Sequence, residues 1–306
     1  MGGQHVAVPA GTYIIAVSGG VDSVVLLDLL AQDDGLKLIV AHFDHGIRTD
    51  SADDAQFVKE LATKYNLPFE QERAELGPDA SESEARQKRY DFLRRVATKY
   101  NADALITAHH QDDLIETSMI NIVRGTGRHG LTSLKSRQGM LRPMLSIPKH
   151  ELIAYAKEKK LDWREDSTNS DTKYLRNKIR HEVVTKMTLE QKHQWLRILE
   201  KAQDNNHKLD NELQNLLRRG LHKNQIVLSR TWFVRLPHNL SREVVNALLK
   251  RAGAKEIDRK TVEKLVVQIK TLPHGKHLQA SGVDIELTKR SARFKSRGSQ
   301  EALKHV

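Results

Sequence analysis

The sequence contains no cysteine, and this absence excludes several kinds of chemistry. Without cysteine, the chain cannot form disulfides, hold a metal ion through thiolates or carry sulfur as a covalent intermediate. No apolar run approaches the ~18 residues that a membrane-spanning helix requires. The N-terminus also lacks the charged start and long apolar stretch of a signal peptide. We therefore expect a cytoplasmic protein.

The charge of the chain is unevenly distributed. Its 306 residues suit two domains better than one, because single cores usually stop growing before that size. Residues 1–172 carry a net charge of −5 and residues 173–306 a net charge of +16, which together give the +11 of the chain. A basic surface can serve solubility alone, but a charge concentrated in one half favours a polyanionic partner.

The first half alternates short apolar runs with helical patterns. The predicted strands are residues 13–17, 38–41, 68–71 and 104–107, and the predicted helices are residues 24–30, 53–65, 82–100 and 112–124. This alternation predicts an α/β fold with a doubly wound parallel sheet. Ligands of such sheets bind beyond the carboxyl ends of the strands. Polar clusters follow three of these strands, at residues 18–23, 42–48 and 109–116, so we expect them to form one site.

The second half has a different pattern. Residues 149–160 are predicted to form a helix that closes the first domain, and residues 191–219 form one long helix or two short ones. Further helices are expected at residues 242–251 and 259–270, with strands at residues 276–279 and 283–288. The predicted domains are a catalytic domain at residues 1–188, a helical connector at 189–219 and a basic domain, α+β or mostly helical, at 220–306.

Residues 18–23, Ser-Gly-Gly-Val-Asp-Ser, lie between a predicted strand and a predicted helix. Two glycines allow the backbone to turn tightly, and the helix N-terminus directs N–H groups and partial positive charge toward an anion. Ser18 and Ser23 can donate to phosphate oxygens, whereas Asp22 cannot favour a bare phosphate and indicates a bridging Mg²⁺. A simple turn with a Ser or Asp cap is the alternative. The six residues together favour phosphate binding, in a loop that differs from Walker A.

Three carboxylates begin the helix predicted after the fourth strand. Asp112 and Glu116 are four residues apart, and Asp113 and Glu116 three, so the acids lie on neighbouring parts of one helix face. Acids near a helix start can simply complement the helix dipole. Their expected position at the same sheet edge as the glycine loop favours a role in binding Mg²⁺ or a cationic substrate.

Residues 108–117 (AHHQDDLIET) and 124–127 (RGTG) resemble the signature of the tRNA(Ile)-lysidine synthetase family, which belongs to the PP-loop ATP pyrophosphatases. Further blocks agree with this family in order: HFDHGIR at 42–48, EARQKRY at 84–90, RPML at 142–145, WREDSTN at 163–169 and RNKIRH at 176–181. The resemblance covers about residues 12–185 and is far less specific beyond them. Leu114 departs from the family, which usually has Gln there, but all three acids are retained.

The resemblance implies an adenine nucleotide alpha hydrolase-like, Rossmann-like fold and an ATP-dependent ligation. In this family, ATP adenylates the C2 carbonyl oxygen of cytidine 34 in the CAU anticodon of tRNA(Ile). The side-chain amine of L-lysine then attacks C2 to form lysidine, and AMP and pyrophosphate are released. The implied cofactors are ATP and Mg²⁺, and the implied partners are tRNA(Ile) and L-lysine. A homodimer is one assembly compatible with the sequence.

The resemblance also assigns roles to residues of this chain. The implied catalytic residues are Asp22, which would also hold Mg²⁺, His110, Asp113 and Glu116. The implied ATP-binding residues are Ser18, Gly19, Gly20, Val21, Asp22, Ser23, His45 and Ala108. The implied lysine- and tRNA-binding residues are Arg86, Arg89, Asp112, Asp113, Glu116, Arg124, Arg176 and Arg180. Each arginine could instead be an ordinary surface ion-pair residue. Weaker candidates for RNA phosphate contacts are Arg197, Lys201, Lys208, Arg218, Arg219 and Lys223.

Three other functions are compatible with parts of the sequence. An ATP pyrophosphatase that thiolates tRNA typically needs cysteines, and this chain has none. An amidotransferase-type synthetase would normally need a glutaminase partner and no basic second domain. An RNA-binding module with an inactive nucleotide fold would not need the intact loop and acids. Members of the resembled family commonly carry a further C-terminal domain, so this chain is either a compact form or truncated.

Overall fold

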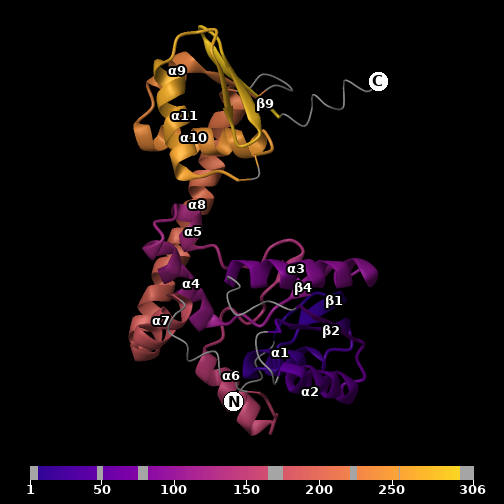
Figure 1. Ribbon diagram of the computed structural model, residues 1–306. Coiled ribbons are helices and arrows are strands. Elements are labelled where there is room, and N and C mark those ends of the chain that lie inside the picture. Colours follow the sequence, from indigo (N-terminus) through magenta and orange to yellow (C-terminus); the bar gives the residue numbers. More distant parts are fainter. Residues whose placement is uncertain are drawn as a thin grey trace, which may run out of the picture. The chain divides into compact units, whose positions relative to one another are not determined.

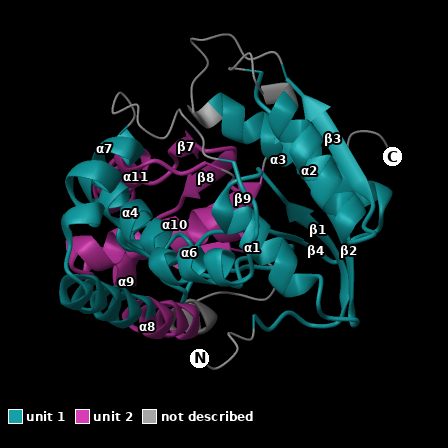
Figure 2. Cartoon of the chain, turned by 90° about the horizontal axis from the view of Figure 1, so that it is seen from below, with its two compact units in different colours: residues 1–203 teal, residues 204–306 magenta. Residues whose placement is uncertain are grey.

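The computed structural model describes residues 6–46, 51–74, 82–164, 175–220, 226–254 and 256–296. The chain divides into two compact units, residues 1–203 and 204–306 (Figure 2). The boundary between them falls within one helix, α8 (Leu189–Gly220). The division into three parts at residues 188 and 219 stays a prediction.

The first unit is built on a five-stranded sheet. Its strands are β1 (Gly11–Ala16), β2 (Leu36–Asp44), β3 (Phe69–Arg73), β4 (Ala104–Ile106) and β5 (Met140–Leu141). Their order is β3-β2-β1-β4-β5, and every neighbouring pair is parallel. The four strands expected from apolar runs are all present. Strand β5 was not predicted, because two residues are too short to produce a recognisable run.

The helices of the first unit follow the predicted alternation. They are α1 (Val21–Leu30), α2 (Ser51–Lys64), α3 (Glu82–Lys99), α4 (Gln111–Val123), α5 (Arg128–Leu131), α6 (Lys149–Glu158), α7 (Leu175–Glu182) and the short 3₁₀ turn η2 (Val184–Lys186), with α8 after them. Helices α5 and α7 were not predicted. Both are short: α5 has four residues, and α7 has eight, of which only Ile179 is buried.

Side chains alternate between the two faces of the sheet and so create two cores. Tyr13 and Ile15 of β1 pack with α1, α2 and α6, whereas Ile14 packs with Leu93 and Val96 of α3. Figure 1 shows α3 on one side of β1 and β2, and α1 and α2 on the other. The predicted doubly wound parallel sheet is therefore confirmed. Its parallel strands place the loops after β1, β2 and β4 at one edge.

The second unit is a small α+β fold. Its antiparallel sheet has the order β6-β9-β8-β7, formed by β6 (Ile226–Ser229), β7 (His277–Ala280), β8 (Val283–Leu287) and β9 (Ser291–Ser296). The unit also contains the C-terminal part of α8, whose Leu213 lies in its core, and the helices α9 (Arg230–Val234), α10 (His238–Arg251) and α11 (Arg259–Thr271). Within the described ranges of both units, none of the helices combines the length and the apolar character needed to cross a membrane.

A buried carboxylate fixes the helices that lie beside the glycine loop. Asp28 of α1 is only 9% exposed, and its Oδ1 accepts a hydrogen bond of 2.6 Å from the Tyr65 hydroxyl. Its Oδ2 accepts bonds from the Tyr155 hydroxyl of α6 at 2.7 Å and from Gln32 at 3.2 Å. Burying a carboxylate is costly unless it is hydrogen-bonded, so these donors hold α6 and Tyr65, which directly follows α2, against α1.

We expect Tyr155→Phe to lower the free energy of unfolding by about 1.5 kcal/mol, because a hydrogen bond to a charged group is lost. Denaturant unfolding measures the change. In an Asp28→Ala background the same substitution should lower the free energy of unfolding by clearly less, since the hydrogen-bond acceptor is already absent. An equal cost in both backgrounds would show that Tyr155 stabilises the protein independently of Asp28.

Candidate active site

The glycine loop is held in one conformation by its own hydrogen bonds. Gly19 has a φ of +92°, which favours glycine, and a β-carbon there would lie 3.5 Å from Phe57 and Val58. The Ser23 Oγ accepts from the Ser18 amide at 3.2 Å and donates to the Gly20 carbonyl at 2.9 Å. Gly20 is the N-cap of α1 and has no side chain to cap the helix. The loop therefore presents a helix N-terminus suited to an anion.

Asp22 lies in the first turn of α1 and contacts two other segments. The Lys149 Nζ at the start of α6 lies 2.6 Å from both of its carboxylate oxygens. His110, the N-cap of α4, places its Nε2 3.6 Å from the Asp22 Oδ2 and 3.5 Å from the Asp113 Oδ2. The structure thus brings the glycine loop and the acidic helix together, with His110 between the two carboxylates.

The carboxylates of α4 are matched by cations from α7. Arg180 binds Glu116 through its Nε at 2.6 Å and its Nη2 at 2.9 Å, and the same Nη2 lies 3.4 Å from the Asp113 Oδ1. Arg176 lies 3.7 Å from Glu116, whose side chain is 1% exposed. Asp113 also accepts a 3.0 Å bond from the His110 amide. A buried carboxylate requires such partners, so α7 completes the site.

The surroundings separate the acidities of these two neighbouring carboxyl groups. Burial alone would raise the pKa of Asp113, but His110, through its ring and its backbone amide, and Arg180 outweigh burial and lower that pKa. For Glu116, burial raises the pKa more than the Arg180 guanidinium lowers it. Asp113 is therefore more strongly held in its ionised form, while Glu116 accepts a proton more readily than Asp113 does. Neighbouring acids with divergent pKa values are typical of catalytic sites.

Asp112 is oriented differently from the other two acids. Its Oδ2 accepts a 2.7 Å bond from the Lys192 Nζ of α8, and both side chains are 15% exposed. Nearby, the Trp195 Nε1 of α8 donates to the Ser118 hydroxyl of α4 at 2.8 Å. Asp112 therefore helps to attach α8 to α4, and its predicted contact with lysine or tRNA stays a prediction.

Arg86 and Arg89 of α3 surround a buried tyrosine. Their guanidinium carbons lie 4.9 and 5.3 Å from the ring centroid of Tyr90, and the Arg86 Nη2 is 3.4 Å from its hydroxyl. Buried Arg142 bonds to the Lys135 carbonyl and lies 2.9 Å from the Met140 sulfur. Burial would raise the pKa of Tyr90, but the three guanidinium groups lower it. Such a concentration of positive charge suits an anionic ligand.

The remaining predicted residues are spread more widely. His45, just after β2, has its ring 5.0 Å from that of Phe43, and Ala108 lies between β4 and His110. Arg124 is exposed at the far end of α4 and is not brought together with the acids at its start. Residues 47–48 of the HFDHGIR block and 165–169 of the WREDSTN block lie outside the described residues.

Sequence reasoning did not identify Lys149, Tyr90 or Lys192 as site residues. Lys149 could have been recognised, because a cation at a helix N-terminus is unfavourable with the helix dipole. Its position therefore indicates a nearby anionic group. The interactions of Tyr90 and Lys192 depend on segments that are distant in sequence. No periodic pattern could reveal them.

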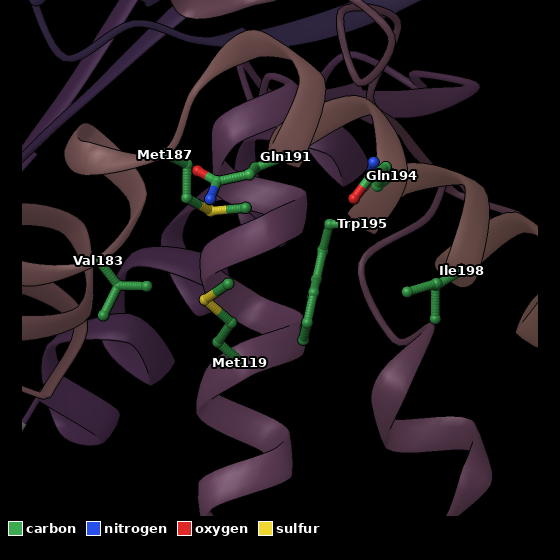
Figure 3. Close-up of a pocket in the computed structure, with 7 residues that line it drawn as sticks. All are labelled: Met119, Val183, Met187, Gln191, Gln194, Trp195 and Ile198. Atoms are coloured by element: carbon green, nitrogen blue, oxygen red, sulfur yellow. The ribbon is translucent and has the colours of Figure 1, made fainter.

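An apolar pocket of about 280 Å³ lies elsewhere, on the face formed by α4, η2 and α8 (Figure 3). Its lining residues are Met119, Val183, Met187, Gln191, Gln194, Trp195 and Ile198. In this view the Trp195 ring stands between Met119 on one side and Gln194 and Ile198 on the other. None of the predicted catalytic or ATP-binding residues lines this pocket.

Few of the described side chains near the glycine loop could serve as ligands of Mg²⁺. No cluster of three or more His, Asp or Glu side chains suited to a metal occurs in the described part of the chain. Mg²⁺ usually takes one or two carboxylates, with phosphates and waters as the other ligands. Asp22, with Asp113 on the opposite side of His110, fits a metal ion held mainly by phosphate oxygens.

Comparisons with known proteins agree with the resemblance seen in the sequence motifs. A family model described as a PP-loop domain matches residues 4–187. A tRNA(Ile)-lysidine synthase of Solibacter usitatus is 38% identical over 179 residues, 58% of this chain and 41% of that protein. The enzyme of the same name from Thermus thermophilus is 41% identical over 179 residues, 56% of this chain and 35% of that protein. These relatives confirm the resemblance seen in the sequence. The chain spans less than half the length of either.

A solved structure shares the fold. A U34-tRNA thiolase from Methanococcus maripaludis, determined with its [4Fe-4S] cluster, aligns with a TM-score of 0.53 at 19% identity. The alignment covers 65% of this chain and 74% of that one. Cysteine is the usual ligand of such clusters, and this chain has none. The match therefore supports the fold alone.

His109, beside the acids, generates a prediction on pH. Burial lowers its pKa to about 3, with the charges of Arg142, Arg89 and Arg86 adding to the effect. Unfolded His binds a proton near pH 6.5, so stability should fall as pH decreases from about 6.5 toward 3. In His109→Gln this loss should be smaller, as measured by thermal unfolding between pH 4 and 7.5.

The matched control is exposed His150, because His150→Gln should retain the wild-type pH dependence. Identical pH profiles of the wild type and His109→Gln would contradict the lowered pKa.

Proposed function

This chain belongs to the PP-loop domain family, and we propose on that basis that it ligates L-lysine to C2 of cytidine 34 in the CAU anticodon of tRNA(Ile). The observation that carries the proposal is the contact between the glycine loop and the acidic helix, in which His110 lies 3.6 Å from Asp22. The activity named for the similar synthases supports it. A nucleotide-splitting centre and a cation-binding acidic site are thus adjacent.

The proposed reaction has two steps. The C2 carbonyl oxygen of the cytidine attacks the α-phosphorus of ATP, and pyrophosphate leaves. The side-chain amine of lysine then loses a proton and attacks C2, and cleavage of the C2–O bond releases AMP. His110 and Glu116 are the groups placed to accept that proton, and the raised pKa of Glu116 suits this task.

The charges of the site suit the two substrates. Ser18, Ser23 and the N-terminus of α1 bind the phosphates, and Asp22 would hold a Mg²⁺ that neutralises their charge. Asp113 and Glu116 attract the ammonium group of lysine. Arg86 and Arg89 bind the anionic groups of the RNA or of the amino acid.

The RNA is assigned to the basic part of the chain. Residues 173–306 carry a net charge of +16, and RNA loops are bound through positive grooves and unstacked bases. Arg197, Lys201 and Lys208 are exposed along α8 and are candidate phosphate contacts. The side chains of Arg218 and Arg219, and Lys223, lie outside the described residues.

The decisive experiment incubates the chain with ATP, radiolabelled lysine and candidate tRNAs, followed by nucleoside analysis. We expect label in the RNA only when the anticodon is CAU, together with pyrophosphate release that requires both tRNA and lysine. Pyrophosphate release without RNA would instead favour an amidotransferase-type synthetase. No release under any condition would favour an RNA-binding module.

We expect Glu116→Gln to raise the KM for lysine about tenfold or more, because the ammonium group loses a charged partner. ATP affinity should change much less. The melting temperature should fall, because Arg180 loses its bidentate partner, so the KM is measured below the unfolding transition of the variant. The control is Glu182→Gln, an exposed acid of α7, which should behave as wild type. An unchanged KM for lysine would reject the assignment of Glu116.

A further inference from the structure

The glycine loop contains no basic residue, yet the structure places one beside it. Residues 18–23 supply two hydroxyls, amide groups and one carboxylate. Lys149 Nζ lies 2.6 Å from both oxygens of that carboxylate, Asp22. In Walker A loops, the lysine that reaches the phosphates is part of the motif itself. Here the nearby cation comes from a helix 127 residues away in the sequence.

The position of Lys149 is built into the packing of α6 against α1. Asp22 meets Lys149 at the first turn of the two helices, and Asp28 meets Tyr155 six residues further along each. The two helices therefore run in the same direction and begin at the same level. Leu152 of α6 is fully buried in the core that α1 also enters. The whole helix, rather than the ion pair alone, holds Lys149 beside the loop.

Other cations near the loop have different partners. Arg180, whose charge also reaches Asp22, binds Glu116 through two hydrogen bonds. Arg164 places its guanidinium over the Phe57 ring at 5.2 Å. Lys149 also opposes the dipole of its own helix as the first residue of α6, a cost that a nearby anion would offset.

We propose that Lys149 is the phosphate-binding cation of this loop. Without nucleotide it pairs with Asp22, and when a nucleoside triphosphate occupies the loop its ammonium group moves to the phosphate oxygens. This inference rests on the proposed ATP-dependent function and adds a residue to its nucleotide site.

The exchange of partners is energetically feasible. The Asp22 and Lys149 side chains are 27% and 32% exposed, and partly exposed ion pairs contribute little net stability. The flexible stem of lysine allows its ammonium group to move while the backbone of α6 stays fixed. Asp22 is then released to hold the cation that accompanies the phosphates.

A purely structural role makes a different prediction. If Lys149 serves only to neutralise Asp22, its removal should alter nucleotide binding only through Asp22. The effect of Lys149 should then vanish once Asp22 is uncharged, and it should not depend on the number of phosphates in the ligand.

The test measures dissociation constants of ATP and AMP, each with Mg²⁺, by calorimetry on the full chain. In Lys149→Gln we expect ATP binding to weaken about tenfold or more, with AMP binding nearly unchanged, because the lost contact is to the β- and γ-phosphates. Lys149→Arg should retain most of the ATP affinity. Lys157→Gln, which removes an exposed charge from the last turn of the same helix, should match wild type.

A second comparison uses two variants that both lack the ion pair between Asp22 and Lys149. Asp22→Asn and the double variant Asp22→Asn, Lys149→Gln differ only in Lys149, so they also cover the case in which Lys149→Gln alone fails to fold. Weaker ATP binding by the double variant supports the proposal. Equal ATP affinities of these two proteins, or equal losses for ATP and AMP in Lys149→Gln, overturn it. A wild-type chain that binds no ATP would instead reject the proposed function.

Discussion

The need to neutralise carboxylates at one edge of a parallel sheet connects the parts of the first unit. Asp22 is paired with Lys149 of α6, Glu116 with Arg180 of α7 and Asp112 with Lys192 of α8. In each pair, the carboxylate lies on a helix that directly follows a strand of the parallel sheet, α1 or α4. The cation lies on a helix later in the sequence of the unit. Because an unpaired buried charge is strongly destabilising, the pairs of Glu116 and Asp112 specify where α7 and α8 attach, whereas the partly exposed pair of Asp22 adds little to the packing of α6.

The same pairing defines how the site can respond to ligands. Asp22, Asp112 and Glu116 are already paired with cations, so a charged substrate that binds to any of these groups would have to exchange partners with it. Under the proposed function, a triphosphate would compete with Asp22 for Lys149, and an ammonium group would compete with Arg180 for Glu116. Such exchanges favour ligands that carry both a positive and a negative charge. The carboxylate and the cation of the separated ion pair can then each pair with a group of the ligand. Under the proposed function, ATP with its cation and L-lysine, which carries both ammonium and carboxylate groups, would have this property.

Much of the fold was predictable because its signals are local. Apolar runs identified β1, β2, β3 and β4, and the glycine loop identified the turn into α1. Strand β9 was missed because its sequence, SARFKS, has charged residues on its exposed face and only Ala292 and Phe294 buried. Helix α7 was not predicted, because its eight residues, LRNKIRHE, are mostly polar or charged and only Ile179 is buried.

The sequence by itself determined the alternation of strands and helices, the glycine loop and the spacing of the acids on α4, since each follows from neighbouring residues and the backbone geometry they prefer. Only the tertiary structure decided which cation faces which carboxylate. Lys149, Arg180 and Lys192 are 127, 64 and 80 residues from their partners. Whether these charged groups come into contact depends on how whole helices pack. The residues next to a lysine or arginine in the sequence do not indicate which carboxylate it will neutralise.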